Sequence, residues 1–338
     1  MLINTAIKNF LSAHKVENCS QTTLRNIWFA LFPFAEWLKT TYGVTDTDDL
    51  KIDHLREWVV YLQETPSSRG AVRLDSSVHN YAVNLKAFCH WLEREEILVK
   101  LITPRFRLPK VEQKFIPTFT PDDVRKLFEA CDEGGIRYKH YPHIRKALSA
   151  RNRAIVAVFI DTGIRLRELV GLRLVDVDRD MRVLVVHRKG NKWQQVPISW
   201  EGFKPLHEYL TKHRPHLAKL SGSPMMRKDD PVFLNEDGSV LTAAGIKSLF
   251  DRIKRRANIE GKRVSPHQCR RYMATSQLAG GRSPLDVQRQ MGHTTLTMTN
   301  RYASLSVQQL RESHDQFSPL RAKSSDDGES LGSGYWEE

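Results

Sequence analysis

A proline-rich, basic segment over residues 103–119 limits what this chain can fold into. Three of its residues are prolines. A proline inside a helix removes a backbone donor and clashes with the preceding turn, so this stretch cannot be one continuous helix and is predicted to be a semi-rigid linker. With 338 residues, the chain is long enough for a hydrophobic core on each side of the segment. We therefore expect two domains.

The residues before the linker carry the apolar spacing of helices. Aliphatic and aromatic residues recur three to four positions apart over residues 24–38, 55–62 and 78–92. A further short helix is expected before Cys19. These runs predict a four-helix domain over residues 1–102, with the aromatic side chains packed in its core.

The residues after the linker combine helices with a short β-hairpin. Thr120 is predicted to cap a helix whose first residue is Pro121. Two strand-like runs, 182–188 and 193–198, flank the turn Lys189-Gly-Asn-Lys, which is a hairpin signal. Further helices are expected at about 151–161, 200–213, 242–257, 266–279, 284–291 and 295–302, with another from Ser306.

The predicted fold is therefore mainly α with a small β-sheet. A helical N-terminal domain is followed by an α+β domain over residues 120–320. The acidic residues 321–338, rich in Gly and Ser, are predicted to form a disordered tail.

Basic residues outnumber acidic ones in this chain. Lys and Arg total 52 against 39 Asp and Glu, a formal net charge of +13. This balance favours a polyanionic partner, and nucleic acid over an acidic membrane. No apolar run is long enough to span a bilayer, and the first residues do not resemble a signal peptide. The four cysteines lack paired C-x-x-C spacing, which argues against a zinc site or a disulfide framework and fits a reducing cytoplasm.

A series of polar residues in the second domain suits one kind of chemistry. Two arginines, a lysine, two histidines and a tyrosine could together grip a phosphodiester, attack it with a phenol and protonate the leaving oxygen. In chain order these residues are Arg165 (with Glu168), Lys189, His267, Arg270, His293 and Tyr302.

Each of these residues has a simpler explanation when it is taken alone. Arg165 and Glu168, three apart on a helix, could be a surface ion pair that contributes little. A lysine at a hairpin tip is commonly just solvated, and a tyrosine in the context of Tyr302 is normally half-buried packing. Because a phenol with a pKa of about 10 is ionised only about once in a thousand at neutral pH, attack needs a base and positive neighbours.

Four sequence boxes occur together and in order, and their conjunction is more specific than any one of them. They are T-G-I-R-L-R-E-L-V-G-L, R-K-G-N-K-W-Q-Q-V-P-I, S-P-H-Q-C-R-R and M-G-H-T-T-L-T-M-T-N-R-Y. With these boxes the chain resembles the tyrosine recombinase (phage integrase) family, most closely its compact Xer-type members. The likeness in organisation covers about residues 1–320, and the specific boxes begin at Thr162.

The resemblance implies a role for each polar residue. Tyr302 would be the nucleophile that forms a 3′-phosphotyrosyl enzyme and frees a 5′-hydroxyl. Lys189 would be the general acid for the leaving oxygen. Arg165 and Arg270 would grip the non-bridging oxygens of the phosphate, and Glu168 would orient Arg165.

The two histidines complete the implied site. His267 would assist proton transfer from the tyrosine, and His293 would hydrogen-bond the phosphate. Positive charge at the phosphoryl group can replace a divalent metal, so no metal, cofactor or ATP is expected. The implied fold is a helical core-binding domain joined to a tyrosine recombinase catalytic domain.

The implied partner is double-stranded DNA that carries recombination sites. Family members exchange strands through a Holliday junction as a homo-tetramer on synapsed DNA, which implies a monomer or weak oligomer when the protein is free. The helix from Ser306 matches the segment that docks on a neighbouring protomer, and accessory directionality factors could be further partners. The basic residues expected to contact DNA are Arg69, Arg73, Lys86, Arg105, Arg107, Lys110, Lys114 and Arg271.

Two positions depart from the family pattern. Arg271 stands where many relatives have a histidine, and Arg188 stands where many relatives have a glycine. The second departure leaves Lys192 as an alternative general acid, although Lys189 is favoured.

Three other functions are compatible with parts of the sequence. A type IB topoisomerase-like nicking and closing enzyme would share the chemistry, but the apparent C-terminal docking helix favours a recombinase. A DNA-binding protein without catalysis would not need Tyr302. A metal nuclease is disfavoured because acids are not clustered and histidines are not paired. Integration, excision, transposition, dimer resolution and inversion share this chemistry and differ in the arrangement of sites and in accessory partners.

Overall fold

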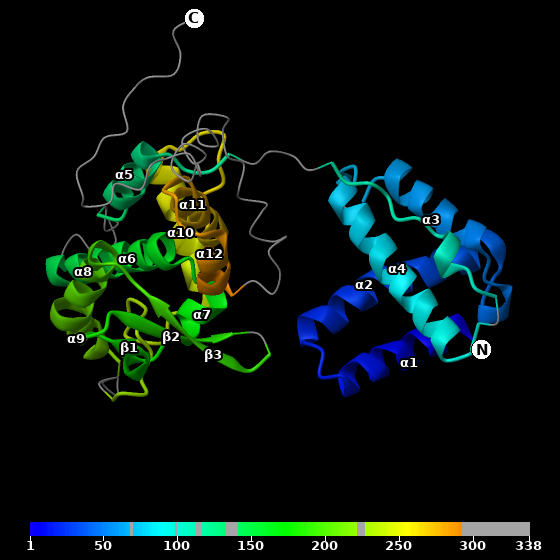
Figure 1. Cartoon of the computed structure of the whole chain (residues 1–338), viewed down its shortest axis with the longest axis horizontal. Helices are drawn as coiled ribbons and strands as arrows, with labels where there is room; N and C mark the ends of the chain where they lie inside the picture. The colour runs from blue at the N-terminus through cyan, green and yellow to red at the C-terminus, as the bar shows by residue number, and fades with distance from the viewer. Residues whose placement is uncertain are drawn as a thin grey trace, which may run out of the picture. The chain divides into compact units, whose positions relative to one another are not determined.

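The computed structural model describes residues 1–67, 70–98, 100–112, 117–132, 141–188, 190–221 and 227–292. It separates the chain into two compact units, Met1–Phe115 and Ile116–Glu338 (Figure 1). The division falls inside the segment predicted to be a linker. Several predicted features lie outside the described residues: Arg69, Lys114, Lys189, His293, Tyr302, the tail and the helices expected at 295–302 and from Ser306.

The first unit is helical, as the apolar spacing predicts. Its described elements are α1 (Ile3–Val16), α2 (Gln21–Tyr42), η1 (Thr47–Asp49), α3 (Ile52–Glu64), α4 (Asp75–Arg94) and η2 (Thr103–Arg105). Local sequence sets the ends of α2, because the Ser20 hydroxyl accepts a hydrogen bond from the Thr23 backbone amide at 3.1 Å. Gly43 ends the same helix in the left-handed conformation, with φ of +67°.

The core of the first unit is rich in aromatic side chains. Phe34, Trp58 and Phe88 are fully or almost fully buried and belong to one cluster. Trp28 differs, because 43% of its surface is exposed, so the prediction that the aromatic residues pack in the core is wrong for this residue. Its ring instead packs against Phe29 and Phe32 of the same helix, on a face of α2 outside the apolar stripe.

The second unit combines helices with one small sheet. In chain order its described elements are α5 (Pro121–Ala130), α6 (Pro142–Thr162), α7 (Leu166–Gly171), η4 (Leu174–Asp176), β1 (Val177–Asp178), β2 (Val183–Arg188), β3 (Lys192–Pro197), α8 (Trp200–Glu208), η5 (Tyr209–His213), α9 (Arg214–Ala218), α10 (Ala243–Ala257), α11 (Pro266–Ala279) and α12 (Pro284–Met291). Helix α6 is the central element, and it packs against α8 and α11. The predicted fold class, mainly α with a small sheet, is confirmed.

Two helix starts test the local sequence signals. Thr120 caps α5 as predicted, because its hydroxyl accepts from the Asp123 amide at 3.2 Å. Helix α6 begins at Pro142, earlier than the start predicted near Arg151. Proline suits the first position of a helix, and Ala147 and Leu148 are buried against the core, although the basic residues around them hide the apolar period.

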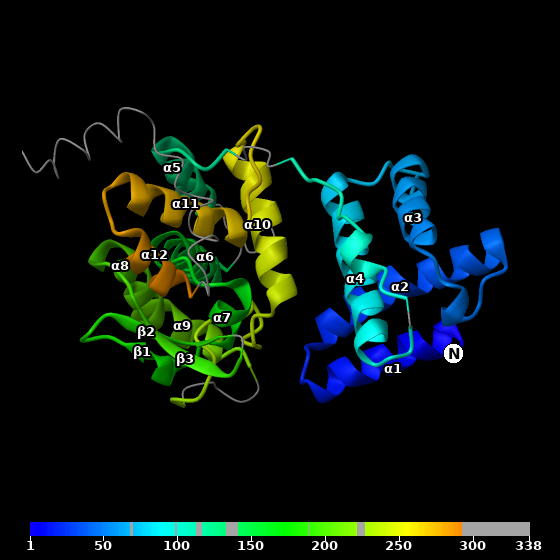
Figure 2. The ribbon, with the colours of Figure 1, turned by 45° about the vertical axis from the view of Figure 1, so that its right-hand side comes forward.

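The sheet lies beside α7 at one edge of the second unit (Figure 2). Its strand order is β1-β2-β3, with both pairs antiparallel. The predicted hairpin is present, and its last pair is Arg188 opposite Lys192. Strand β1 was not expected from the sequence because its two residues are too short to show alternation. No described helix is long and apolar enough to cross a membrane.

Candidate active site

Arg165 is held at the junction between α6 and α7. Helix α6 ends at Thr162, and Gly163 turns the chain in the left-handed region, with φ of +63°. The buried Glu168 carboxylate then accepts two bonds from Arg165, one from its backbone amide and one from Nη1, each at 2.8 Å. Oε2 accepts the bond from the backbone amide and Oε1 accepts the bond from Nη1. The second of these bonds orients the guanidinium of Arg165. The pairing of Arg165 with Glu168 that the spacing suggested is therefore present.

Arg270 and His267 come from the first turns of α11. Ser265 caps this helix by accepting a hydrogen bond from the Gln268 amide at 3.3 Å, and Pro266 occupies its first position. Arg270 is 5% exposed. Its Nη1 donates to the Gly163 carbonyl and its Nη2 donates to the Met291 carbonyl, the latter at 2.7 Å. This one guanidinium therefore joins the end of α6 to the end of α12.

The C-terminal end of α12 brings the two predicted phosphate-gripping arginines together. Its last carbonyls have no partner within the helix and carry partial negative charge. The Met291 carbonyl accepts from Arg270, and the Gly292 carbonyl accepts from Arg165 Nη2 at 3.3 Å. In the chain, His293 follows directly after these two carbonyls.

Arg188 is a third guanidinium at this helix end, and the sequence reasoning did not assign it to the site. It is 7% exposed and donates to the Met291 carbonyl and, at 2.6 Å, to the Gln290 carbonyl. The alternation of β2 could have revealed it, because Leu184, Val186 and Arg188 share the buried face of the strand. Its partners lie far along the chain, and no sequence pattern identifies them.

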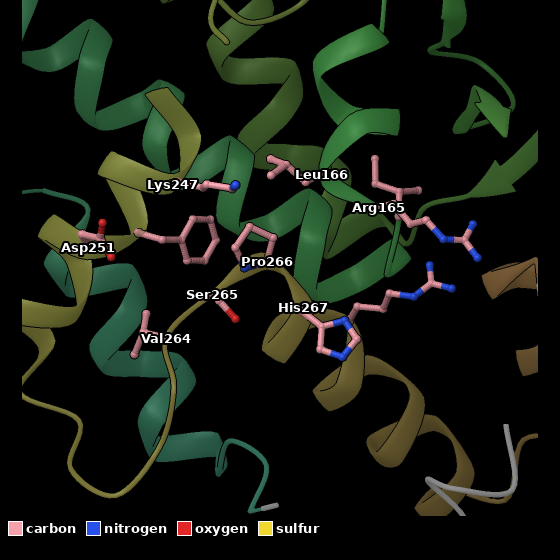
Figure 3. Close-up of a pocket in the computed structure, with 11 residues that line it drawn as sticks. Arg165, Leu166, Lys247, Asp251, Val264, Ser265, Pro266 and His267 are labelled. Atoms are coloured by element: carbon pink, nitrogen blue, oxygen red, sulfur yellow. The ribbon is translucent and has the colours of Figure 1, made fainter. Parts of the chain in front are cut away.

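An open pocket of about 630 Å³ lies next to these groups (Figure 3). Arg165 and His267 lie along one side of it, while Lys247 and Asp251 of α10 lie on the opposite wall. Apolar side chains also line the pocket, namely those of Ile164, Leu166, Phe250, Val264 and Pro266. Cationic donors thus border a space whose apolar walls strengthen electrostatic interactions.

The His267 side chain is exposed at this pocket, although neighbouring protein shields part of it from solvent. This partial burial lowers the pKa of His267 below its ordinary value of 6.5, and the positive charges of Arg270 and Arg271 lower it further. The imidazole is therefore neutral at neutral pH. A neutral imidazole can accept a proton, which an imidazolium cannot.

The predicted DNA-contacting residues have different surroundings. Arg105, Arg107 and Lys110 are exposed. Lys86 is half-buried and donates to the Phe106 carbonyl at 2.9 Å, and Arg73 donates to the Thr65 carbonyl at 2.5 Å. Arg271 was expected to point to solvent or DNA, but it is half-buried, with its Nε shielded from solvent.

Comparisons with known proteins identify the family. Residues 117–309 match the phage integrase family. The tyrosine recombinase XerC of Lactobacillus delbrueckii subsp. bulgaricus is 31% identical over 266 residues, which is 79% of this chain and 83% of the relative. The tyrosine recombinase XerD of Listeria innocua serovar 6a is 27% identical over 318 residues, which is 94% of this chain and 99% of the relative. The chain therefore belongs to the phage integrase family of tyrosine recombinases, which are site-specific DNA recombinases.

Solved structures agree on the fold. The Tn1549 transposon integrase in complex with circular intermediate DNA superposes with a TM-score of 0.67 at 20% identity, covering 93% of this chain and 99% of that one. The XerH site-specific recombinase bound to difH substrate gives a TM-score of 0.63 at 19% identity, covering 91% of this chain and 82% of that one. The family resemblance and the enzyme class predicted from the sequence boxes are confirmed, and the topoisomerase alternative gains no support.

Proposed function

We propose that this recombinase cleaves and rejoins DNA at its recombination sites through a covalent bond to Tyr302. The phenol oxygen attacks the scissile phosphorus, the bond from phosphorus to the 5′ oxygen breaks, and a 3′-phosphotyrosyl enzyme and a free 5′-hydroxyl result. The 5′-hydroxyl of a second strand then attacks the phosphotyrosine and releases the phenol. Bond energy is conserved in the intermediate, so no ATP is needed.

The observation that carries this proposal is the convergence of Arg165 and Arg270 on neighbouring carbonyls at the end of α12. A guanidinium has five N–H donors in a planar fork that matches two phosphate oxygens. Arg165 uses two of its donors on Glu168 and Gly292, so donors are left for a non-bridging oxygen. Fixed cations at the phosphate stabilise the charge that develops during attack.

Proton transfer is assigned to two further residues. Neutral His267 accepts the proton of the Tyr302 phenol, directly or through water, and its lowered pKa suits this role near neutral pH. Lys189, which follows Arg188 in the chain, gives a proton to the leaving 5′ oxygen. His293 donates a hydrogen bond to the phosphate.

The assembly on DNA follows from the strand-exchange chemistry. Two duplexes must each be cut and joined to the other, which requires four active sites, so we propose a homo-tetramer on two synapsed sites. The first unit and the exposed basic residues Arg105, Arg107 and Lys110 would hold the duplex. The helix from Ser306 would dock on a neighbouring protomer, and accessory factors would set the direction of recombination. The enzyme would act in the cytoplasm.

Strand exchange between two labelled duplexes tests this function. The duplexes come from the DNA that flanks the gene and differ in length, so recombinant strands have new lengths on a denaturing gel. Wild type and Tyr272→Phe should give recombinants, and Tyr302→Phe should give none. Tyr272 is a matched control because its ring packs against Phe119 and it has no role in the proposed chemistry. Relaxation of a plasmid that carries these sites, without any recombinant product, would contradict the proposal.

A further inference from the structure

Arg188 is an unusual residue for the end of a hairpin strand. Arginines at such positions are normally solvated, but this one is 7% exposed. Burial lowers the pKa of Arg188, and the charge of nearby Arg165 adds to this effect while Glu168 opposes it. An arginine stays protonated in proteins even so, and therefore a buried positive charge needs compensation.

The compensation comes from the end of α12. Nη1 and Nη2 of Arg188 donate to the Met291 and Gln290 carbonyls, which form the negative end of the helix dipole. Strand β3 adds a second tie, because Gln194 Nε2 donates to the Arg289 carbonyl at 2.6 Å. Both strands of the hairpin are thus bonded to the last turn of one helix.

The turn after α12 is shaped around this guanidinium. Gly292 has φ of +61°, and a Cβ atom at this position would lie 2.6 Å from Arg188 Cζ. The absence of a side chain at position 292 therefore gives Arg188 the space to reach the carbonyls. The end of strand β2 and the turn after α12 therefore pack closely where Arg188 meets Gly292.

We propose that Arg188 is a positioning residue that fixes the β2–β3 hairpin against the Gln290–Gly292 turn and thereby sets where Lys189 meets the leaving oxygen. Arg188 itself does not touch the substrate in this scheme. Lys189 is the next residue of the chain, so we expect its reach toward the leaving oxygen to depend on where Arg188 is held. In the chain, His293 follows Gly292 on the other side of this contact. The hydrogen bonds of Arg188 and Gln194 hold the hairpin and the turn in one arrangement. This inference rests on the proposed function of Lys189.

A substrate with a sulfur leaving group distinguishes a misplaced general acid from a loss of activity that has another cause. A 5′-bridging phosphorothiolate replaces the leaving oxygen by sulfur. The sulfur departs as a thiolate and needs no proton from the enzyme, because thiols are acidic: the cysteine thiol, for example, has a pKa of about 8.5. An alkoxide does need a proton, because a hydroxyl is far less acidic than a thiol. A variant that has lost only the acid, or its position, should regain its rate on the sulfur substrate.

The experiment measures single-turnover cleavage of matched oxygen and sulfur duplexes by the full-length protein. The duplexes carry a site that wild type cleaves. Arg188→Met should slow cleavage of the oxygen substrate by about 10- to 100-fold, because misplacing a reacting group by about 1 Å has that effect. On the sulfur substrate its rate should return to within about threefold of wild type. Binding of intact duplex should change by no more than about twofold, and exposed Arg179→Met is the matched control with no change on either substrate.

Further variants keep the test decisive. Arg188→Lys retains the charge but has a single donor group, so it should lose less activity on oxygen and also recover on sulfur; it replaces Arg188→Met if that variant does not fold. Lys189→Ala should be rescued by sulfur and Arg165→Ala should not. If Lys189→Ala is rescued but the Arg188 variants stay slow on sulfur, or are not slow on oxygen, the inference on Arg188 is wrong. If Lys189→Ala is not rescued, the assigned general acid is wrong, which is a different failure.

Discussion

At the scale of single residues, the contacts of Glu168 determine how Arg165 is oriented. Its side chain is 3% exposed and holds both the backbone amide and Nη1 of Arg165. Because 42% of the Arg165 side chain is exposed, solvent screens part of the charge attraction. The main effect of Glu168 is therefore expected on the orientation of the arginine, with a smaller effect on stability.

Glu168→Gln tests this expectation. The amide keeps the shape but loses the charge and one acceptor, so we expect about 1 kcal/mol less stability to urea unfolding. Single-turnover cleavage should fall by about tenfold or more, since a loosened arginine stabilises the transition state less. Exposed Glu201→Gln is the control. Equal cleavage by Glu168→Gln and wild type would contradict the orienting role.

The lowered pKa of His267 predicts a pH profile. Because this pKa lies below its ordinary value of 6.5, the imidazole becomes protonated only at lower pH than an ordinary histidine, and the decline in cleavage rate should move to lower pH in the same way. Arg271→Gln removes one of the positive charges that lower this pKa and should move the decline to higher pH. A profile that is identical in wild type and Arg271→Gln would contradict the assignment.

The free energy of unfolding should also depend on pH through the protonation of His267. The folded pKa of His267 lies below the unfolded value of 6.5, so the unfolded chain binds a proton that the folded chain does not. The free energy of unfolding should therefore fall as the pH drops from 6.5 toward the folded pKa. His267→Gln should lose this part of the pH dependence, which urea titrations at several pH values would measure. An unchanged dependence in that variant would show that His267 does not titrate this way.

At the scale of elements, the end of α12 organises the site. Carbonyls of residues 289–292 accept side-chain donors from β2, β3, α11 and the start of α7. A helix end that is normally satisfied by water or a local cap is here satisfied by three guanidiniums and an amide. Disturbing this turn should therefore affect several elements together.

Gly292→Ala is the sharpest test at this scale. Its positive φ alone costs about 1 kcal/mol for alanine. The added Cβ must also displace Arg188, which removes buried hydrogen bonds at about 1–3 kcal/mol. Gly43→Ala is the matched control, because Gly43 also ends a helix at φ of +67° but has no atom within 4 Å of the added Cβ. In an Arg188→Gly background, Gly292→Ala should cost no more than Gly43→Ala, and a full additional loss there would contradict the fitted contact.

The sequence predicted elements whose signals are local. The four helices of the first unit, the Thr120 cap and the β2–β3 hairpin follow from apolar spacing, capping residues and the turn at Gly190. The early start of α6 was missed because basic residues interrupt its apolar period. Trp28 was misassigned because it lies on a face of α2 outside the apolar stripe, whereas burial of Arg188 depends on carbonyls of a helix far along the chain. Which side chains meet at a helix end is a property of the fold that no single segment encodes.

At the scale of the whole molecule, the net charge of +13 predicts binding that depends on salt. Each phosphate contact contributes a slope of about −0.9 when log affinity is plotted against log salt concentration. Replacing exposed Arg105, Arg107 and Lys110 by glutamine should reduce the slope by up to about 3, with little effect on cleavage at saturating DNA. The control is Arg125→Gln with Lys126→Gln, because these residues already pair with acids on α5. No change of slope in the linker variant, or a loss no larger than that of the control, would contradict the proposed phosphate contacts of the linker residues.

The covalent intermediate is the central claim, and trapping it is the most direct measurement. Wild type, Tyr272→Phe and Tyr302→Phe are incubated in EDTA with nicked duplexes from the DNA that flanks the gene, and SDS-resistant adducts are digested and mapped by mass spectrometry. We predict a nucleotide on the Tyr302 peptide in wild type and in Tyr272→Phe, and no adduct in Tyr302→Phe. Tyr209 is unsuited to attack, because it is fully buried and its burial raises the pKa of the phenol to about 12. An adduct that persists in Tyr302→Phe, or one that maps to another residue, would contradict the proposed mechanism.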